Sequence, residues 1–112
     1  MVDLDKLINL EGAMAAFSFS SKGELQESRI NTDSEMDDTI LDLIAHVCVA
    51  NTSIATMQAR GWENVTGSGG FYPIKGFSLI GFDWTVIANE EAGIIMPNDK
   101  VDYEAAYAAL GA

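Results

Sequence analysis

The sequence predicts a single α+β domain organised around one long helix, roughly Ser34 to Arg60. Apolar residues recur every three or four positions through that segment, and shorter segments with strand-like patterns precede and follow it. Clusters of Gly, Asp, Asn and Ser separate these segments, as turns require. At 112 residues the chain has room for one hydrophobic core, so we expect one domain, residues 1–112.

A short helix is predicted first, over residues 2–10. Its leucines and isoleucine lie among charged residues, which is typical of an amphipathic helix. Asp3 is placed to cap its start, and Gly12 supplies the left-handed residue that commonly follows a helix end.

Two strands are predicted next. From Ala13 the chain has small and aromatic residues of alternating polarity. This pattern predicts a strand with Met14 and Ala16 on one face and Phe17 and Phe19 on the other. Residues 21–23 form a turn, and residues 25–30 form the second strand.

The long helix has clear end signals and two apolar faces. Residues 31–34 offer capping side chains, and Arg60 followed by Gly61 matches the chemistry of a helix C-terminus. The first apolar line comprises Met36, Ile40, Leu43, Val47, Ala50, Ile54 and Met57. An adjoining, largely uncharged line comprises Leu41, Ile44, Ala45, Cys48, Thr52, Ala55 and Ala59. One sheet cannot cover both lines, so we expect the helix to contact a second partner on its other side.

Three more strands and a short helix are predicted after a flexible loop at Gly67 to Gly70. The strands lie near residues 74–81, 84–89 and 92–97, with hairpin turns at Phe82-Asp83 and at residues 89–91. Asp99 opens the last helix, which ends at Gly111.

The charge of the chain excludes some partners. Six basic and seventeen acidic residues give a formal net charge of -11, which repels nucleic-acid phosphates and anionic membrane surfaces. The charge serves solubility, or it steers the protein toward a basic partner. We therefore expect no nucleic-acid binding.

Cysteine content and hydropathy indicate the compartment. Cys48 is the single cysteine, so no internal disulfide forms, and a reducing cytoplasm fits. The first ten residues lack the basic segment and apolar run of a signal peptide. No uninterrupted apolar run approaches the roughly 20 residues that span a bilayer. We expect a cytoplasmic protein without membrane insertion.

No catalytic, metal or cofactor site is predicted. The Gly67–Gly70 loop resembles a phosphate loop in composition, but no Lys-Ser or Lys-Thr pair follows it and no helix begins there. His46 and Cys48 project about 200° apart on a helix and cannot share a metal as neighbours. The carboxylates of residues 33–42 lack the central Gly of a calcium loop and are explained by helix capping.

An interaction surface is the stronger hypothesis. Arg and Trp often carry interface energy, and Arg60 and Trp62 lie together at the predicted helix end. Aromatic residues surround the third strand, which as a sheet edge would offer its backbone to another chain. Core closure by the same residues is the alternative explanation. The candidate interaction residues are Ile44, Val47, Cys48, Thr52, Ala55, Arg60, Trp62, Phe71, Tyr72 and Phe77.

The element order and several motifs resemble the roadblock/LC7 domain, and most closely a family of uncharacterised single-domain bacterial roadblock-like proteins. The resemblance covers essentially the whole chain. The motifs are Leu4-Asp5-Lys6-Leu7 before Glu11-Gly12, the helix segment 49–62, Pro73 with Gly76-Phe77, and Asp99-Lys100-Val101-Asp102-Tyr103.

The resemblance implies a five-stranded antiparallel sheet of order 2-1-5-4-3, with the long helix on one face and the terminal helices on the other. It also implies a homodimer in which third strands pair and long helices pack together. Roadblock proteins are generally not enzymes and bind small GTPases or act as assembly platforms. We therefore expect a non-enzymatic homodimer that regulates or scaffolds a GTPase or an enzyme complex. The alternatives are a sensor that binds a small molecule between sheet and helices, and an enzyme whose site a partner subunit completes.

Overall fold

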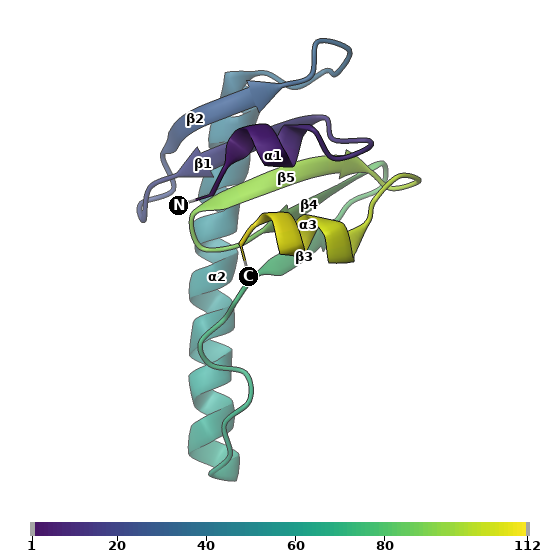
Figure 1. Ribbon diagram of the computed structural model, residues 1–112. Coiled ribbons are helices and arrows are strands. Elements are labelled where there is room, and N and C mark those ends of the chain that lie inside the picture. Colours follow the sequence, from purple (N-terminus) through teal and green to yellow (C-terminus); the bar gives the residue numbers. More distant parts are fainter. Residues whose placement is uncertain (1, 112) are drawn as a thin grey trace.

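The computed structural model describes residues 2–111 as a three-layer α+β fold. The elements are α1 (Leu4–Ile8), β1 (Ala15–Phe19), β2 (Leu25–Ile30), α2 (Asp38–Thr66), β3 (Phe77–Ile80), β4 (Trp84–Ala88), β5 (Ala92–Pro97) and α3 (Tyr103–Ala109). The strands form one antiparallel sheet of order β2-β1-β5-β4-β3. This confirms the expected fold class and strand order (Figure 1).

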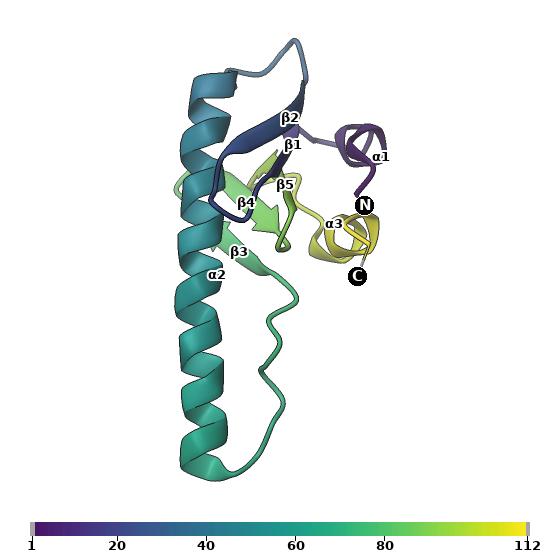
Figure 2. The ribbon, with the colours of Figure 1, turned by 90° about the vertical axis from the view of Figure 1, so that its left-hand side faces the viewer.

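Two separate hydrophobic clusters hold the layers together. α1 and α3 cover one face of the sheet, and α2 lies on the other (Figure 2). Phe17 and Phe19 of β1 share one face and Ala16 lies on the other, as predicted; the face with the two phenylalanines is the α2 side. Met14 packs with the α2-side cluster and not with Ala16, because it precedes the strand and lies outside its alternation.

The long helix is shifted relative to the prediction. It begins at Asp38, because Asp37 caps it by accepting a hydrogen bond from the backbone N–H of Ile40 at 2.9 Å. The predicted start at Ser34 is wrong: the backbone N–H of Ser34 donates to the carbonyl of Asn31 in a turn.

The predicted end of this helix at Arg60 is also wrong. Gly61 stays helical, and α2 continues for almost two more turns to Gly67, which adopts the left-handed conformation at φ 72°. Its backbone N–H donates to the carbonyl of Glu63 at 2.8 Å. A helix-interior glycine costs roughly 1 kcal/mol relative to alanine, which a long packed helix tolerates.

The other boundaries differ by a few residues. α1 is shorter than predicted, running from the Asp3 cap to Asn9. β3 begins at Phe77 and not near Ile74, which lies beside α2 together with Phe71 before the sheet pairing starts. The last helix is capped by Asp102 and not by Asp99. The predicted hairpin turns at residues 82–83 and 89–91 are confirmed.

Candidate functional site: an exposed helix and an open sheet edge

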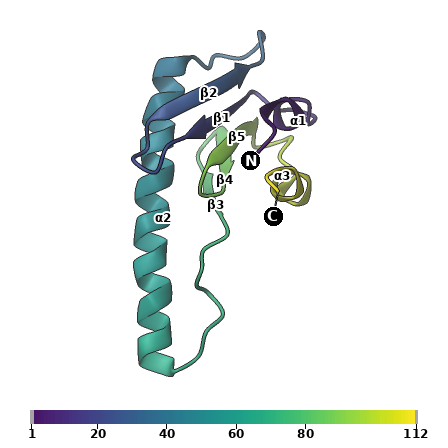
Figure 3. The ribbon, with the colours of Figure 1, turned by 60° about the vertical axis from the view of Figure 1, so that its left-hand side comes forward.

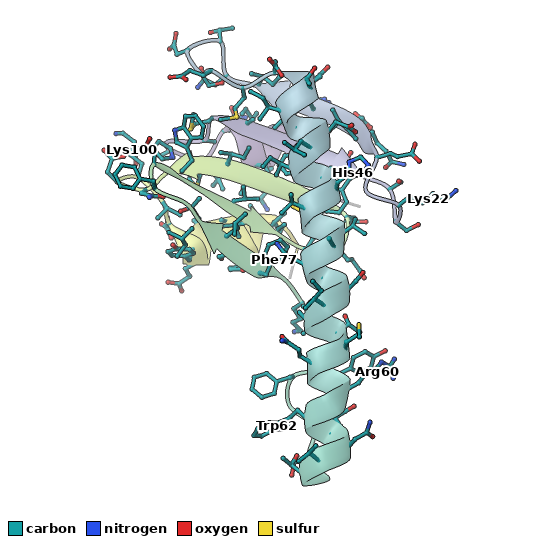
Figure 4. The ribbon with its side chains drawn as sticks, turned by 180° about the vertical axis from the view of Figure 1, so that it is seen from behind. Lys22, His46, Arg60, Trp62, Phe77 and Lys100 are labelled. Carbon is teal, nitrogen blue, oxygen red and sulfur yellow. The ribbon has the colours of Figure 1, made fainter. Side chains whose placement is uncertain are left out.

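The length of α2 is about twice the width of the sheet that it crosses. Its 29 residues span about 43 Å at 1.5 Å per residue. Four spacings of about 4.8 Å make the five-stranded sheet only about 19 Å wide. The helix crosses the sheet from β2 toward β3 and then continues past the β3 edge (Figures 1 and 2). We call the part beyond β3, which includes Arg60 and Trp62, the overhang (Figure 4).

The overhang explains the elongated shape of the molecule. Its principal extents are 48 × 29 × 26 Å, and the radius of gyration is 14.2 Å. A compact chain of this length would have a radius of gyration of about 13 Å. Half of a long helix therefore lies outside the body of the domain.

A loop returns along the overhang and is held to it on two sides (Figure 3). The ring of Phe71 packs edge-on against Trp62, with 5.4 Å between ring centroids. The guanidinium of Arg60 lies 4.1 Å from the ring centroid of Tyr72 and donates a hydrogen bond to its hydroxyl at 2.6 Å. Because Arg60 and Trp62 project from opposite sides of α2, residues 71 and 72 straddle the helix. We call this arrangement the aromatic clasp.

The clasp leaves apolar surface exposed. A shallow pocket of about 330 Å³ is lined by Ala55, Gln58, Ala59, Trp62, Phe71 and Ile74. Ala59 is buried beneath it, but both aromatic rings keep about half of their surface in solvent. With 46% of its surface exposed, Trp62 closes the core only in part, which was the alternative to a role at an interface.

The sheet face toward α2 is only partly covered. Two helices lie on the opposite face, whereas α2 alone lies on this one, and strands β3 to β5 extend to one side of it (Figure 4). There the structure has an apolar groove of about 170 Å³ between α2 and the sheet. The groove is lined by Met36, Ile40, Ile44, Leu79, Gly81, Trp84, Val86 and Ile95.

The side of α2 that faces away from the sheet is also apolar. We call it the outer face; it comprises Leu43, Val47, Ala50, Ile54 and Met57. Leu43 is 64% exposed and Met57 is 74% exposed, which is unusual for large aliphatic side chains in a row. The residues buried against the sheet come from the second line and include Leu41, Ala45 and Cys48.

The two sheet edges differ in character. β2 carries Glu27 and Arg29, and charged side chains protect a sheet edge from pairing with other chains. β3 pairs only with β4 and has the sequence Phe-Ser-Leu-Ile, without a charge. β3 is therefore the edge that is open to another strand.

The candidate residues predicted from the sequence lie partly on the surface and partly in the core. Ile44 lines the groove, and Val47 lies on the outer face. Arg60, Trp62, Phe71 and Tyr72 form the clasp, and Ala55 lines the pocket beside it. Phe77 packs against the α2-side core, and Thr52 is partly buried. Cys48 is 1% exposed, so it lies inside the protomer and not on a surface.

Sequence reasoning singled out Phe82 and Trp84 among the aromatic residues around the third strand, but it did not identify the groove and it missed Leu79. Leu79 lies two residues after Phe77 and so shares its face, and Trp84 shares the face of Val86. Phe82 is 98% exposed at the β3–β4 turn. Strand alternation could have identified Leu79 and Trp84 as facing the long helix.

Among the described residues, neither Cys48 nor His46 lies in an arrangement typical of a reactive centre. Burial raises the pKa of the Cys48 thiol to about 12, the opposite of an activated nucleophile. His46 is exposed, and its Nδ1 lies 2.7 Å from the carbonyl oxygen of Asp42. Among residues 2–111, no three His, Cys, Asp or Glu side chains are grouped to hold a metal.

The Gly67–Gly70 loop follows a helix C-terminus. Phosphates bind at helix N-termini, where backbone N–H groups and the positive end of the helix dipole meet. The loop begins at the opposite, negative end of α2. This geometry disfavours the phosphate-loop interpretation.

By length and hydropathy alone, α2 would also be able to cross a membrane. Polar residues interrupt its apolar ones, so the criterion of an uninterrupted apolar run does not select it, and no membrane span was predicted. Core helices of globular domains pass the same test, and one side of α2 packs against the sheet here.

Several solved structures share this fold. A roadblock/LC7 domain from Streptomyces avermitilis has a TM-score of 0.67 at 10% identity, covering 95% of this chain and 82% of that one. A structure described as MglB with tetrameric arrangement has a TM-score of 0.69 at 14% identity, with coverages of 95% and 75%. The gliding protein MglB from Thermus thermophilus has a TM-score of 0.62 at 17% identity, with coverages of 96% and 84%.

Comparison with curated proteins found no match. A conserved-family profile described as "Uncharacterized conserved protein (DUF2173)" matches residues 3–112. The chain therefore belongs to this family of uncharacterized conserved proteins, and its fold is of the roadblock/LC7 type.

Proposed function

We propose that the protein is a cytoplasmic, non-enzymatic, homodimeric interaction module that regulates or scaffolds a small GTPase or an enzyme complex. The length of α2 is the observation that carries the dimer. The helix is about 43 Å long, and a single sheet is about 19 Å wide. It is therefore long enough to cross its own sheet and that of a second copy.

Self-complementarity supports a second copy as the partner. Antiparallel pairing of β3 with the β3 of another chain would continue the sheet past the open edge. The second sheet would then lie over the overhang, and the second α2 would run antiparallel to the first on the partly covered sheet face. A two-fold interface uses the same patch on both copies, and each copy offers both an overhang and an apolar groove on the partly covered sheet face.

The regulatory role rests on the roadblock resemblance and on the outer face. Leu43, Ala50 and Met57 point away from the sheet, so a second α2 beside the first would leave them available to a further protein. Two antiparallel helices would present this apolar surface twice. Some structures of similar fold are of MglB, and one of these is described as tetrameric.

The mass in solution tests the dimer. Sedimentation equilibrium between about 0.1 and 100 μM should give twice the chain mass of 12.0 kDa at the upper end. A strict monomer at tens of micromolar would contradict the proposal.

The regulatory role needs its own measurement. The purified dimer is titrated against small GTPases of the same cell, each loaded with GDP or with a non-hydrolysable GTP analogue. An affinity that differs between the two nucleotide states supports regulation. Equal affinities support a scaffold, and no binding to any of them removes GTPases as the partner.

A ligand sensor is the second candidate, because the groove lies between sheet and helix, where such a ligand would bind. Its apolar lining suits a small hydrophobic molecule. Ligand and second copy would compete for this space, so a bound ligand should shift the monomer–dimer equilibrium toward monomer.

A further inference from the structure

We propose that Trp62, supported by Phe71, fills the apolar groove of the second copy, beside Ile44, Leu79 and Trp84. This inference rests on the proposed homodimer and specifies its principal contact. The occupant is the overhang of a second copy of this chain.

Helix geometry places Ile44 and Trp62 on the same side of α2. Positions 44 and 62 differ by 18 residues, which is five full turns at about 3.6 residues per turn. When two such helices run antiparallel about a two-fold axis, residues equally far from the axis on one side face each other. Trp62 faces Ile44 of the other copy when the axis lies near residue 53, midway between them.

The structure puts the sheet edge at that level. Cys48 packs in the same core cluster as Phe77 of β3, whereas Ala55 lies beside Ile74, which precedes β3. α2 therefore crosses the β3 edge between residues 48 and 55. A two-fold axis that pairs two β3 strands lies half a strand spacing, about 2.4 Å, beyond that edge. Residue 53 lies between residues 48 and 55, so the axis falls at the level along α2 that the contact between Trp62 and Ile44 requires.

The groove and the clasp match in chemistry. None of the eight groove residues is charged, and the groove would hold about five or six waters at roughly 30 Å³ each. The apolar lining of the groove offers these waters few hydrogen-bond partners. An aromatic ring that replaces them would remove both the lining and its own surface from solvent. Trp62 is 46% exposed although Phe71 already supports one side of its ring.

The charge distribution favours this contact between two acidic chains. A net charge of -11 on each copy opposes association. Between Ile44 and Ala59, however, α2 has no Asp, Glu, Lys or Arg. The interface is therefore expected to form through this uncharged stretch and its two ends, with Trp62 and Phe71 making the principal contact.

Cross-linking tests the geometry directly. In a Cys48→Ala background, a chain with Ile44→Cys is mixed with a chain with Trp62→Cys and oxidised. We expect a disulfide-linked heterodimer. The matched control is Asp42→Cys mixed with Asn64→Cys: these positions are also equally far from residue 53, but each projects about 200° away from the neighbouring test position. Linkage of the control pair and not of the test pair would overturn the inference while leaving the dimer intact.

Fluorescence tests the burial of Trp62 without a cysteine. In a Trp84→Phe variant Trp62 is the only tryptophan. Dilution from about 100 μM to below the dissociation constant should shift its emission to longer wavelength and increase acrylamide quenching several-fold. A dimer by mass whose Trp62 is quenched as strongly as in the monomer would refute the contact.

Affinity provides a third readout. Trp62→Ala should weaken dimerisation by about 10- to 100-fold, as for other interface aromatics, and Leu79→Ala by about 10-fold. The double variant should lose less than the product of the two, because the side chains contact each other. Val65→Ala, an exposed residue of the same overhang, serves as control and should change affinity less than about 3-fold. Independent effects of Trp62 and Leu79 would contradict the proposal, whereas monomers at every concentration would already refute the dimer.

Discussion

Gly93 of β5 lies directly beneath the ring of Phe17 in the neighbouring strand β1. A β-carbon at position 93 would lie 2.7 Å from Cζ of Phe17 and 3.1 Å from Cε1. Phe17 is fully buried on the α2 side of the sheet, so its ring has no free space to move into. The absence of a side chain at Gly93 therefore allows this ring to lie flat on the central strands.

Gly93→Ala should lower the free energy of unfolding by about 1–3 kcal/mol, the usual cost of overpacking a core. Gly61→Ala is the matched control, because a β-carbon there would meet nothing within 4 Å. In mid-helix it should raise stability by about 0.5–1 kcal/mol. Urea denaturation at one protein concentration measures both, and equal effects of the two variants would contradict the packing argument.

Asn98 fixes the β3–β4 turn. Its amide donates to the carbonyls of Gly81 and Phe82, and its oxygen accepts a hydrogen bond from Thr85 at 2.6 Å. Asn98→Ala leaves the buried Thr85 hydroxyl without this partner and should cost about 1–3 kcal/mol. Adding Thr85→Val should recover part of that loss. Strictly additive effects in the same denaturation assay would show that the two side chains are not coupled.

The capping residue of α2 can be checked by substitution. Asp37→Ala should destabilise the fold by about 1 kcal/mol, because it removes the acceptor for the Ile40 N–H and a negative charge at the helix N-terminus. Ser34→Ala should cost less, since residue 34 lies in a turn before the helix. A larger loss for Ser34→Ala in thermal unfolding would place the helix start earlier.

Burial of Cys48 predicts a pH dependence of stability. The folded-state pKa of about 12 exceeds the ordinary value of 9.0, so the folded chain retains a proton that the unfolded chain releases. The stability that the protonated thiol contributes is therefore fully present below about pH 9 and falls by about 1.4 kcal/mol per pH unit between about pH 9 and 12. Cys48→Ala should lose less stability over this window than the natural chain. Parallel curves for the two proteins would contradict the assignment, as would rapid native-state labelling of the thiol near pH 8.

The order and type of all eight elements could be predicted from the sequence, because their patterns are local. The helix ends could not. Arg60-Gly61 and Thr66-Gly67 are both acceptable C-terminal signals, and only Gly67 adopts a positive φ. Likewise several polar residues before Asp37 can cap a helix, and the turn made by Asn31 determines which one does.

The candidate surface could be predicted only in part. Both lines of α2 are apolar, and the line that packs against the sheet is the one with smaller side chains, such as Ala45 and Cys48. The larger Leu43 and Met57 remained outside. Arg60 and Trp62 were identified from their residue types, whereas the groove depends on where α2 crosses β3 and β4. That crossing is a tertiary property that no local pattern encodes.

The length of α2 has a further consequence for any dimer of this kind, since it would set the distance between the two-fold axis and Trp62. One helical turn is about 5.4 Å, so inserting four residues before Trp62 would move it about 6 Å, roughly one turn past the groove, while rotating it by only about 40°. Insertions in the loop at Gly69, which is exposed and free of close contacts with backbone, would not alter that spacing. Among homologous chains, helix length would then separate those that pair with one another from those that do not.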